Sequence, residues 1–160
     1  MKAENRQVPH AHYMRMALRE AQRALDEGEV PVGAVVVADH TIIGRAHNQV
    51  EQLKDATAHA EMIALTQAAA ALGGWRLDTC ALYVTLEPCP MCAGALVQCR
   101  LKTLIFGTRD WQQGGALSNF GIVNYAKNIH KVEVIEGVLE AECKAFLSGF
   151  FSRLRHKDAV

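Results

Sequence analysis

The feature that most constrains this chain is a His-x-Glu pair followed, after 26 residues, by Pro-Cys-Pro-Met-Cys. His59, Cys89 and Cys92 have the number and chemistry of the ligands in a catalytic zinc site, where three protein ligands leave the fourth position to water. Glu61 is not needed as a ligand, so its carboxylate is free to exchange protons with that water, whose pKa zinc lowers toward about 7. The fold must therefore bring two distant segments together at one metal.

Helix geometry restricts how these residues share a metal. His59 and Glu61 are two apart, which on a helix surface points them roughly 200° away from each other. They address one metal when the end of a helix points at it, and both fall in the first turn of a helix expected over residues 59–72. Cys89 and Cys92 are three apart, so the start of a helix places both sulfurs on nearly one face. The amides of a helix N-terminus and a metal both favour thiolates there.

Composition indicates one cytoplasmic domain. The chain has 160 residues, half of them apolar, which is enough for a single core. Residues 1–7 are polar rather than a signal peptide, and no apolar run approaches the ~18 residues of a membrane span. Five cysteines, an odd number, suit a reducing compartment. We expect one domain over residues 1–160, with a flexible N-terminal extension at 1–9 and a flexible tail at 156–160.

Hydrophobic periodicity predicts an α/β domain. Helices are expected over residues 14–25, 59–72, 91–100 and 139–154, and strands over 32–38, 41–46, 81–85, 103–106 and 131–135. The first two strands are separated by two residues, which is typical of an antiparallel β-hairpin. The order of these elements predicts a five-stranded mixed sheet between helices.

Four segments together resemble the bacterial tRNA adenosine deaminases, within the zinc deaminases whose signature is H-x-E then P-C-x-x-C. They are Glu-Val-Pro-Val-Gly-Ala-Val-Val-Val at 29–37, His-Asn at 47–48, Thr-Ala-His-Ala-Glu-Met at 57–62 and Thr-Leu-Glu-Pro-Cys-Pro-Met-Cys-Ala-Gly-Ala at 85–95. The resemblance runs from about residue 13 to 155. Guanine deaminases share the zinc signature but tend to carry Pro-Phe-Gly-Ala at 31–34 and Ser-Cys-Glu-Pro-Cys at 85–89. The resemblance implies the cytidine-deaminase-like fold, a three-layer α/β/α domain.

The resemblance implies hydrolysis of adenosine to inosine at the wobble position of a tRNA, using one zinc ion per chain. The partners it implies are the tRNA anticodon stem-loop and a second copy of the chain, as a homodimer. Asn48 is expected to hydrogen-bond the purine, although alone it would be taken as a turn residue. Val32 is expected to form a wall of the base pocket, or else to be an ordinary core residue. Ala60, Leu86 and Asp110 are assigned to the same pocket.

The chain departs from the family after Asp110. The family typically has Pro-Lys-x-Gly-Ala-x-Gly-Ser there, whereas residues 111–118 are Trp-Gln-Gln-Gly-Gly-Ala-Leu-Ser. We expect Trp111 to stack on a single-stranded nucleotide beside the target. The alternative is that Trp111 packs down on the domain and the two glycines make a turn. Arg153 and Arg155, in the basic C-terminal segment, are expected to contact RNA, or else to complement a helix dipole.

Two other functions stay open at this point. One is a deaminase of free nucleosides or nucleobases, such as guanine, with the same zinc chemistry. The other is a zinc-stabilised binding module without catalysis, which requires a fourth protein ligand because structural zinc sites are closed. No further cysteine or histidine stands at ligand spacing in the sequence, which favours an enzyme.

Overall fold

The computed structural model describes residues 9–159, so all but the last residue of the expected N-terminal extension lies outside the described residues. Its strands are β1 (Gly33–Ala38), β2 (Thr41–His47), β3 (Cys80–Leu86), β4 (Thr103–Thr108) and β5 (Glu133–Glu136). They form one sheet in the order β2-β1-β3-β4-β5. Strand β1 is antiparallel to β2 and β3, whereas β3, β4 and β5 run parallel. The predicted five-stranded mixed sheet is therefore confirmed.

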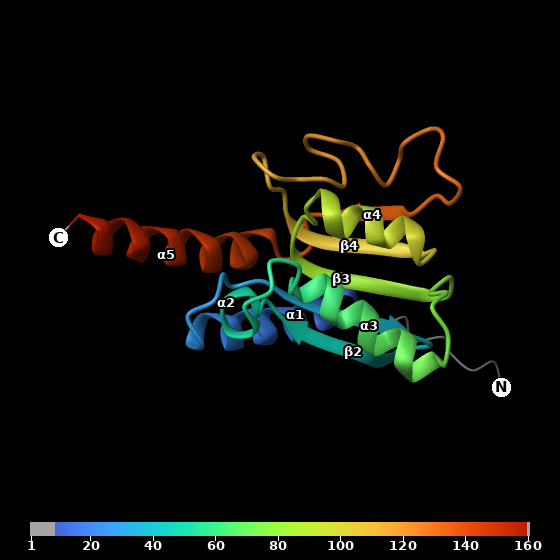
Figure 1. Ribbon diagram of the computed structural model, residues 1–160, viewed down its shortest axis with the longest axis horizontal. Helices are drawn as coiled ribbons and strands as arrows, with labels where there is room; N and C mark the ends of the chain where they lie inside the picture. Colours follow the sequence, from blue (N-terminus) through green and yellow to red (C-terminus); the bar gives the residue numbers. More distant parts are fainter. Residues whose placement is uncertain (1–8, 160) are drawn as a thin grey trace.

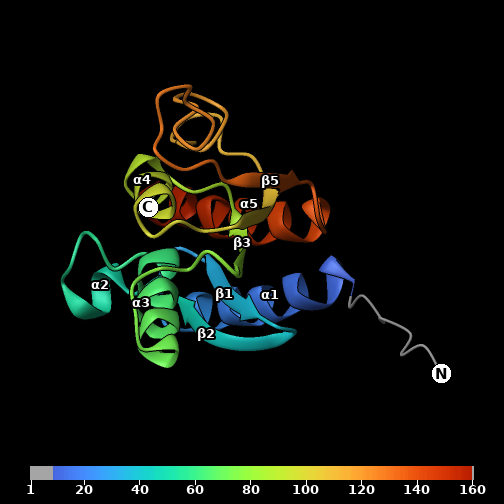
Figure 2. The same cartoon turned by 90° about the vertical axis from the view of Figure 1, so that its right-hand side faces the viewer.

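Helices cover both faces of the sheet (Figures 1 and 2). Helices α1 (His10–Asp26) and α5 (Glu140–Asp158) pack on one face, and α3 (Ala60–Leu72) and α4 (Pro90–Gln98) lie on the other. This arrangement confirms the three-layer α/β/α fold. A short helix, α2 (Val50–Leu53), was not expected, because four residues carry no readable periodicity. Within residues 9–159, no helix combines the length and apolar character that crossing a membrane requires.

The C-terminal helix is longer than expected. Residues 156–158, which we expected in a flexible tail, are helical, because α5 continues to Asp158. Its first turn carries Glu140 and Glu142, and its last turn carries Arg155, His156 and Lys157. Acids near the N-terminus and bases near the C-terminus both complement the helix dipole, which favours the added turn.

The central strands are buried on both faces. Val36, Leu82 and Leu104 are register partners on β1, β3 and β4, and their side chains enter the core beneath α3 and α4. The preceding or following residues, Val35, Tyr83 and Ile105, point to the other face and pack with α1. Because neighbouring side chains on a strand alternate between faces, these strands are mostly apolar and pack against both helical layers.

One edge of the sheet collects the segments that carry chemistry. Strand β1 begins there, while β2, β3 and β4 end there, since Gly33 pairs with His47 and Leu86 pairs with Thr108. The residue before β1 and the residues after β2 and β4 are therefore brought close in space. Helices α3 and α4 also begin at this edge (Figure 1).

Candidate active site

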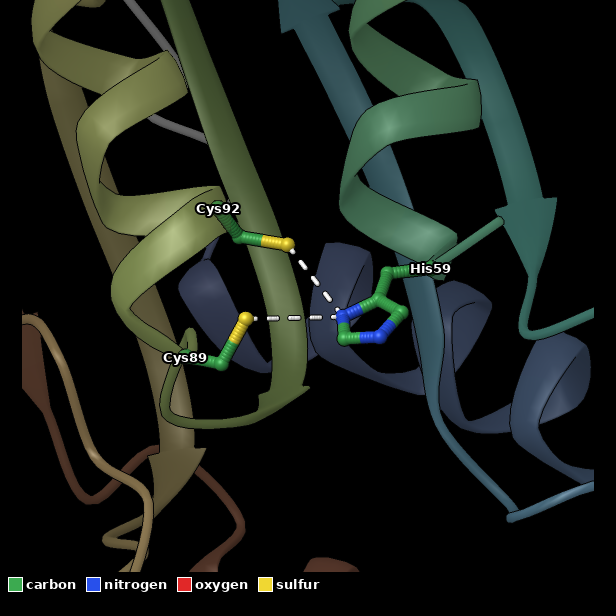
Figure 3. A group of neighbouring side chains, drawn as sticks. All are labelled: His59, Cys89 and Cys92. Carbon is green, nitrogen blue, oxygen red and sulfur yellow. Dashed lines mark hydrogen bonds between the residues drawn. The ribbon is translucent and has the colours of Figure 1, made fainter. Parts of the chain in front are cut away.

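Two helix N-termini hold the histidine and the cysteines. His59 caps the N-terminus of α3, one residue before the helix rather than in its first turn as expected. Cys89 caps the N-terminus of α4, and Cys92 lies in its first turn. The three side chains converge from the two helices (Figure 3). The positive ends of both helix dipoles face this point and favour thiolates.

The distances fit a metal ion. The sulfurs of Cys89 and Cys92 each lie 3.5 Å from Nδ1 of His59, and the three ligand atoms lie within 4.8 Å of one another. A tetrahedral zinc with bonds of about 2.3 Å to sulfur and about 2.0 Å to nitrogen holds those atoms about 3.5 Å apart. Among the residues that the structure describes, no fourth histidine, cysteine or carboxylate joins this group. An open fourth position argues against a closed structural site.

Glu61 is buried beside the cysteines, with 4% of its surface exposed. Its Oε2 lies 3.0 Å from the sulfur of Cys92. Burial raises the pKa of Glu61 above its ordinary value, because a carboxylate loses its hydration there. The group is thus suited to holding a proton as well as releasing one, which a proton carrier requires.

The three groups that could hold a metal influence one another. A hydrogen bond from Cys92, assisted by His59, lowers the pKa of Cys89 to about 4. The hydrogen bond to Cys89 in turn raises the pKa of His59. Without a metal, the site therefore favours the thiolate form of Cys89 and makes His59 easier to protonate. Metal binding competes with protonation of His59, because a histidine ligand is neutral.

A cavity of about 590 Å³ opens beside the metal-binding cluster. All five residues expected in the substrate pocket line it: Val32, Asn48, Ala60, Leu86 and Asp110. Helix α5 adds an apolar wall made by Phe150, Phe151 and Leu154. Sequence reasoning did not place these three residues in the pocket. The sequence shows a pair of aromatic residues in an amphipathic helix. Nothing in the neighbouring sequence indicates that this helix packs beside the end of the sheet where His59, Cys89 and Cys92 lie.

The cavity is lined by several acids and, apart from His59, by no basic side chain among its described lining residues. The carboxylates that line it are Glu29, Glu51, Glu61, Glu87 and Asp110, and no lysine or arginine is found among its described lining residues. Glu29 accepts the backbone N–H groups of Glu51 and Gln52 at 3.2 and 2.7 Å, which satisfies the start of α2. The cavity therefore suits a neutral base better than a phosphate, which would meet several carboxylates and no lysine or arginine among the described lining residues.

Glu87 anchors the divergent loop over the cysteines, a role that sequence reasoning missed. Its buried carboxylate accepts the N–H groups of Asp110, Leu117 and Ser118, at 3.2, 2.9 and 2.9 Å, and the hydroxyl of Ser118. Burial raises the pKa of Glu87, but these hydrogen bonds outweigh it and hold the pKa below the ordinary value. In the sequence, Glu87 is visible only as an acid two residues before Cys89. No sequence pattern shows that it bonds a loop 23–31 residues away.

Gly114 and Gly115 of this loop let its backbone pack closely against neighbouring backbone, and neither has a positive φ. A Cβ on Gly115 would lie 2.4 Å from the backbone nitrogen of Pro90, and one on Gly114 would lie 2.4 Å from the carbonyl oxygen of Asp110. Gly115 also donates its N–H to the carbonyl of Pro88 at 2.8 Å. The loop thus lies directly against the segment that carries Cys89 and Cys92.

Glu87→Gln is expected to lower the free energy of unfolding by about 2–3 kcal/mol, because an amide NH₂ would face backbone N–H donors and charge-assisted hydrogen bonds would be lost. Urea unfolding measures the change. The control is Glu133→Gln, an exposed acid on β5, which should change stability by less than about 0.5 kcal/mol. Equal stability of both variants would mean that Glu87 does not anchor the loop.

Three residues expected to contact RNA lie outside the cavity. Trp111 is 72% exposed, so the alternative that it packs down on the domain is wrong. It borders a separate depression with Phe106, Gly107, Arg109, Glu136, Gly137 and Glu140. Arg153 and Arg155 are exposed on α5 and do not line the cavity. Contact of these three residues with RNA stays a prediction.

The fold and the site define a deaminase. The sequence model of the MafB19-like deaminases matches residues 8–155. The chain is 48% identical over 145 residues to the tRNA-specific adenosine deaminase of Bacillus subtilis, covering 91% of this chain and 90% of that protein. It is also 48% identical to the tRNA-specific adenosine deaminase of Aquifex aeolicus, covering 91% and 95%. The chain belongs to the family of tRNA-specific adenosine deaminases.

Solved structures agree with this assignment. A structure from work on A-to-I editing by tRNA:A34 deaminases superposes with a TM-score of 0.82 at 40% identity, covering 85% of this chain and 99% of that one. The guanine deaminase of Bacillus subtilis gives a TM-score of 0.62 at 29% identity, covering 88% and 93%. The similarity in both fold and sequence is greater to the tRNA deaminase than to this guanine deaminase.

Proposed function

We propose that this protein hydrolytically deaminates adenosine to inosine at the wobble position of a tRNA anticodon, with one zinc ion per chain. The observation that carries the proposal is the cluster of His59, Cys89 and Cys92 beside the buried Glu61, at the end of a cavity without lysine or arginine among its described lining residues. Relatives named tRNA-specific adenosine deaminase support the choice of substrate.

The chain contributes proton transfer and positioning to this reaction. Zinc, when bound by the three ligands, supplies an activated water. Glu61 takes a proton from the attacking water and delivers it to the ring nitrogen of the base. It then takes the remaining proton from the added hydroxyl and passes it to the amine as the bond between carbon and that amine breaks, so that water and adenosine give inosine and ammonia. The raised pKa of Glu61 helps the carboxylate to hold each proton between transfers.

The cavity accepts the base and leaves the RNA backbone outside. Val32 and Leu86 offer apolar contacts to the ring, and Asn48 offers an amide that both donates and accepts. Asn48 is held by its backbone N–H, which donates to the carbonyl of Val32 at 3.1 Å. This bond fixes the residue at the border of the cavity. Anticodon-loop bases are single-stranded, so turning one into the cavity costs little.

Asn48→Ala is expected to lower kcat/KM by about 5- to 150-fold on an anticodon stem-loop, because a purine loses one or two hydrogen bonds. Affinity for the RNA should change much less, since no phosphate contact is removed. Turnover and stem-loop affinity are measured in parallel. Unchanged turnover would return Asn48 to the role of a turn residue.

The direct test of the proposed function is mass spectrometry of tRNA incubated with the protein. The expected product is inosine at the wobble position, with a mass gain of about one dalton at that nucleotide from replacing an amine by an oxygen. Free adenosine, guanine and cytidine are assayed beside the tRNA. Faster turnover of a free base or nucleoside than of the tRNA would favour the alternative substrate class.

A homodimer and a cytoplasmic location complete the proposal. The small residues at the start of α4 support close packing by a neighbour, since a Cβ on Gly94 would meet nothing within 4 Å. A tRNA substrate supports the cytoplasm. Sedimentation equilibrium should give twice the mass of the 17.5 kDa chain, and a single-chain mass would contradict the dimer.

A further inference from the structure

Trp111 is an exposed aromatic residue on a loop that hydrogen bonds hold in shape. Its carbonyl accepts a hydrogen bond from the side chain of Asn119 at 3.0 Å. Asp110 accepts the N–H groups of Gln112 and Gln113 at 3.0 and 2.9 Å, which closes the turn around Trp111. With 72% of its surface exposed, the indole contributes little to the core. Its position is nevertheless fixed at the backbone.

A supported arginine backs this indole. The Cζ atom of Arg109 lies 5.2 Å from the ring centre of Trp111, a cation–π distance. Arg109 is itself fixed by two hydrogen bonds to the carboxylate of Glu136, at 3.1 and 3.3 Å. Because the carboxylate of Glu136 neutralises the guanidinium of Arg109, Trp111 and Arg109 together present a flat indole ring to solvent rather than an unpaired positive charge.

The turn faces two sites at once. Asp110 and Gln113 line the catalytic cavity, whereas Trp111, between them, borders the neighbouring depression. A nucleotide whose base lies in the cavity is connected through its backbone to neighbours that must remain outside. Trp111 directly follows Asp110, which lines the cavity, but does not line it itself, so the indole is placed for a neighbour of the target and not for the target.

We infer that Trp111, backed by Arg109 and Glu136, is a stacking platform for the nucleobase next to the target adenosine. The inference rests on the proposed function, because it takes single-stranded RNA as the ligand. Stacking on an aromatic ring tolerates any base, so this contact selects for an unpaired neighbour rather than for a sequence. Arg109 and Glu136 are positioning residues, which act through the indole.

Tryptophan fluorescence tests the contact without relying on activity. The chain has two tryptophans, and Trp75→Phe leaves Trp111 as the sole emitter. In a Glu61→Gln background, where turnover is expected to be slow, an anticodon stem-loop with adenosine at the wobble position should quench this emission. Replacing the stacked neighbour by an abasic nucleotide should abolish the quenching at one of the two flanking positions. Equal quenching by the intact RNA and both abasic RNAs would overturn the inference.

Trp75 provides the matched control. It is 57% exposed and lies beside Arg76 and Arg100, with Cζ atoms 5.6 and 5.7 Å from the ring. It precedes β3, whereas Trp111 follows β4, and the two strands run parallel. Trp75 and Trp111 therefore lie at opposite ends of the sheet. In a Trp111→Phe protein, emission from Trp75 should not respond to the stem-loop.

Kinetics on the same RNAs separate the inference from the proposed function. Trp111→Ala should lower kcat/KM on the intact stem-loop by about 5- to 150-fold, the fold-change that one base–aromatic stack represents. The loss should vanish on the abasic RNA, while Trp75→Ala should match the unmodified protein throughout. If the unmodified protein deaminates the stem-loop and Trp111→Ala does so equally well, the stacking inference is refuted while the proposed function stands. If the unmodified protein deaminates none of the RNAs, the proposed function fails with it.

Discussion

Glu61→Gln is expected to retain the metal and the fold and to lose turnover by roughly 100- to 10,000-fold, the usual contribution of a positioned proton carrier. Glutamine keeps the size and the hydrogen-bonding reach of the side chain, so the buried site loses no packing. It cannot take a proton from water or pass one to the ring nitrogen. Metal analysis, thermal unfolding and turnover on an anticodon stem-loop are measured on one preparation.

The matched control for Glu61→Gln is Glu51→Gln, which removes another carboxylate from the lining of the same cavity. Glu51 is exposed, and its side chain is not among the groups around the metal-binding cluster. Its loss should change kcat by no more than a few-fold, because it alters the charge of the cavity but moves no proton. Similar losses in both variants would mean that Glu61 acts through cavity charge rather than proton transfer.

The predictable part of this molecule is the part encoded locally. Short apolar runs bounded by turn residues identified the five strands, and helical periodicity identified four of the five described helices, because burial on two faces leaves a continuous apolar run and burial on one face of a helix leaves a repeat. The candidate metal-binding residues were identified for a different reason. Histidine, cysteine and glutamate at this spacing match the ligands and the proton carrier of a catalytic zinc site, and the helix starts they imply are present at His59 and Cys89.

The unpredicted part depends on contacts between distant segments. Glu87 receives its hydrogen bonds from the loop that begins at Asp110, and nothing near Glu87 in the sequence marks those donors. Phe150 and Phe151 line the cavity because α5 extends past the end of the sheet at which α3 and α4 begin. A sequence pattern shows that such residues are aromatic or acidic, but the partner they meet is determined by strand order.

The cysteine ligands give the second large effect. Cys92→Ser is expected to weaken zinc binding by more than about 100-fold, beyond what the loss of an outer hydrogen-bond partner typically costs. A serine hydroxyl stays protonated near neutral pH and is a poor replacement for a thiolate ligand. Turnover should fall in step with metal content, and metal-loaded and metal-free samples should no longer differ in Tm. Metal content is measured by elemental analysis, and affinity is measured by competition with a chelator.

Cys99→Ser is the control, because it makes the same change at the other end of α4. Cys99 is half-buried and donates a hydrogen bond from its sulfur to the carbonyl of Leu96 at 3.5 Å, which a serine hydroxyl also provides. This variant should bind one zinc ion per chain and keep its turnover. Loss of zinc in both variants would indicate that α4 has been disturbed, whereas retention of zinc by Cys92→Ser would remove Cys92 from the ligand set. If zinc is lost in both variants, Cys92→Asp tests the ligand assignment instead. Its carboxylate restores an anionic ligand, and it should recover part of the bound zinc if Cys92 is a ligand.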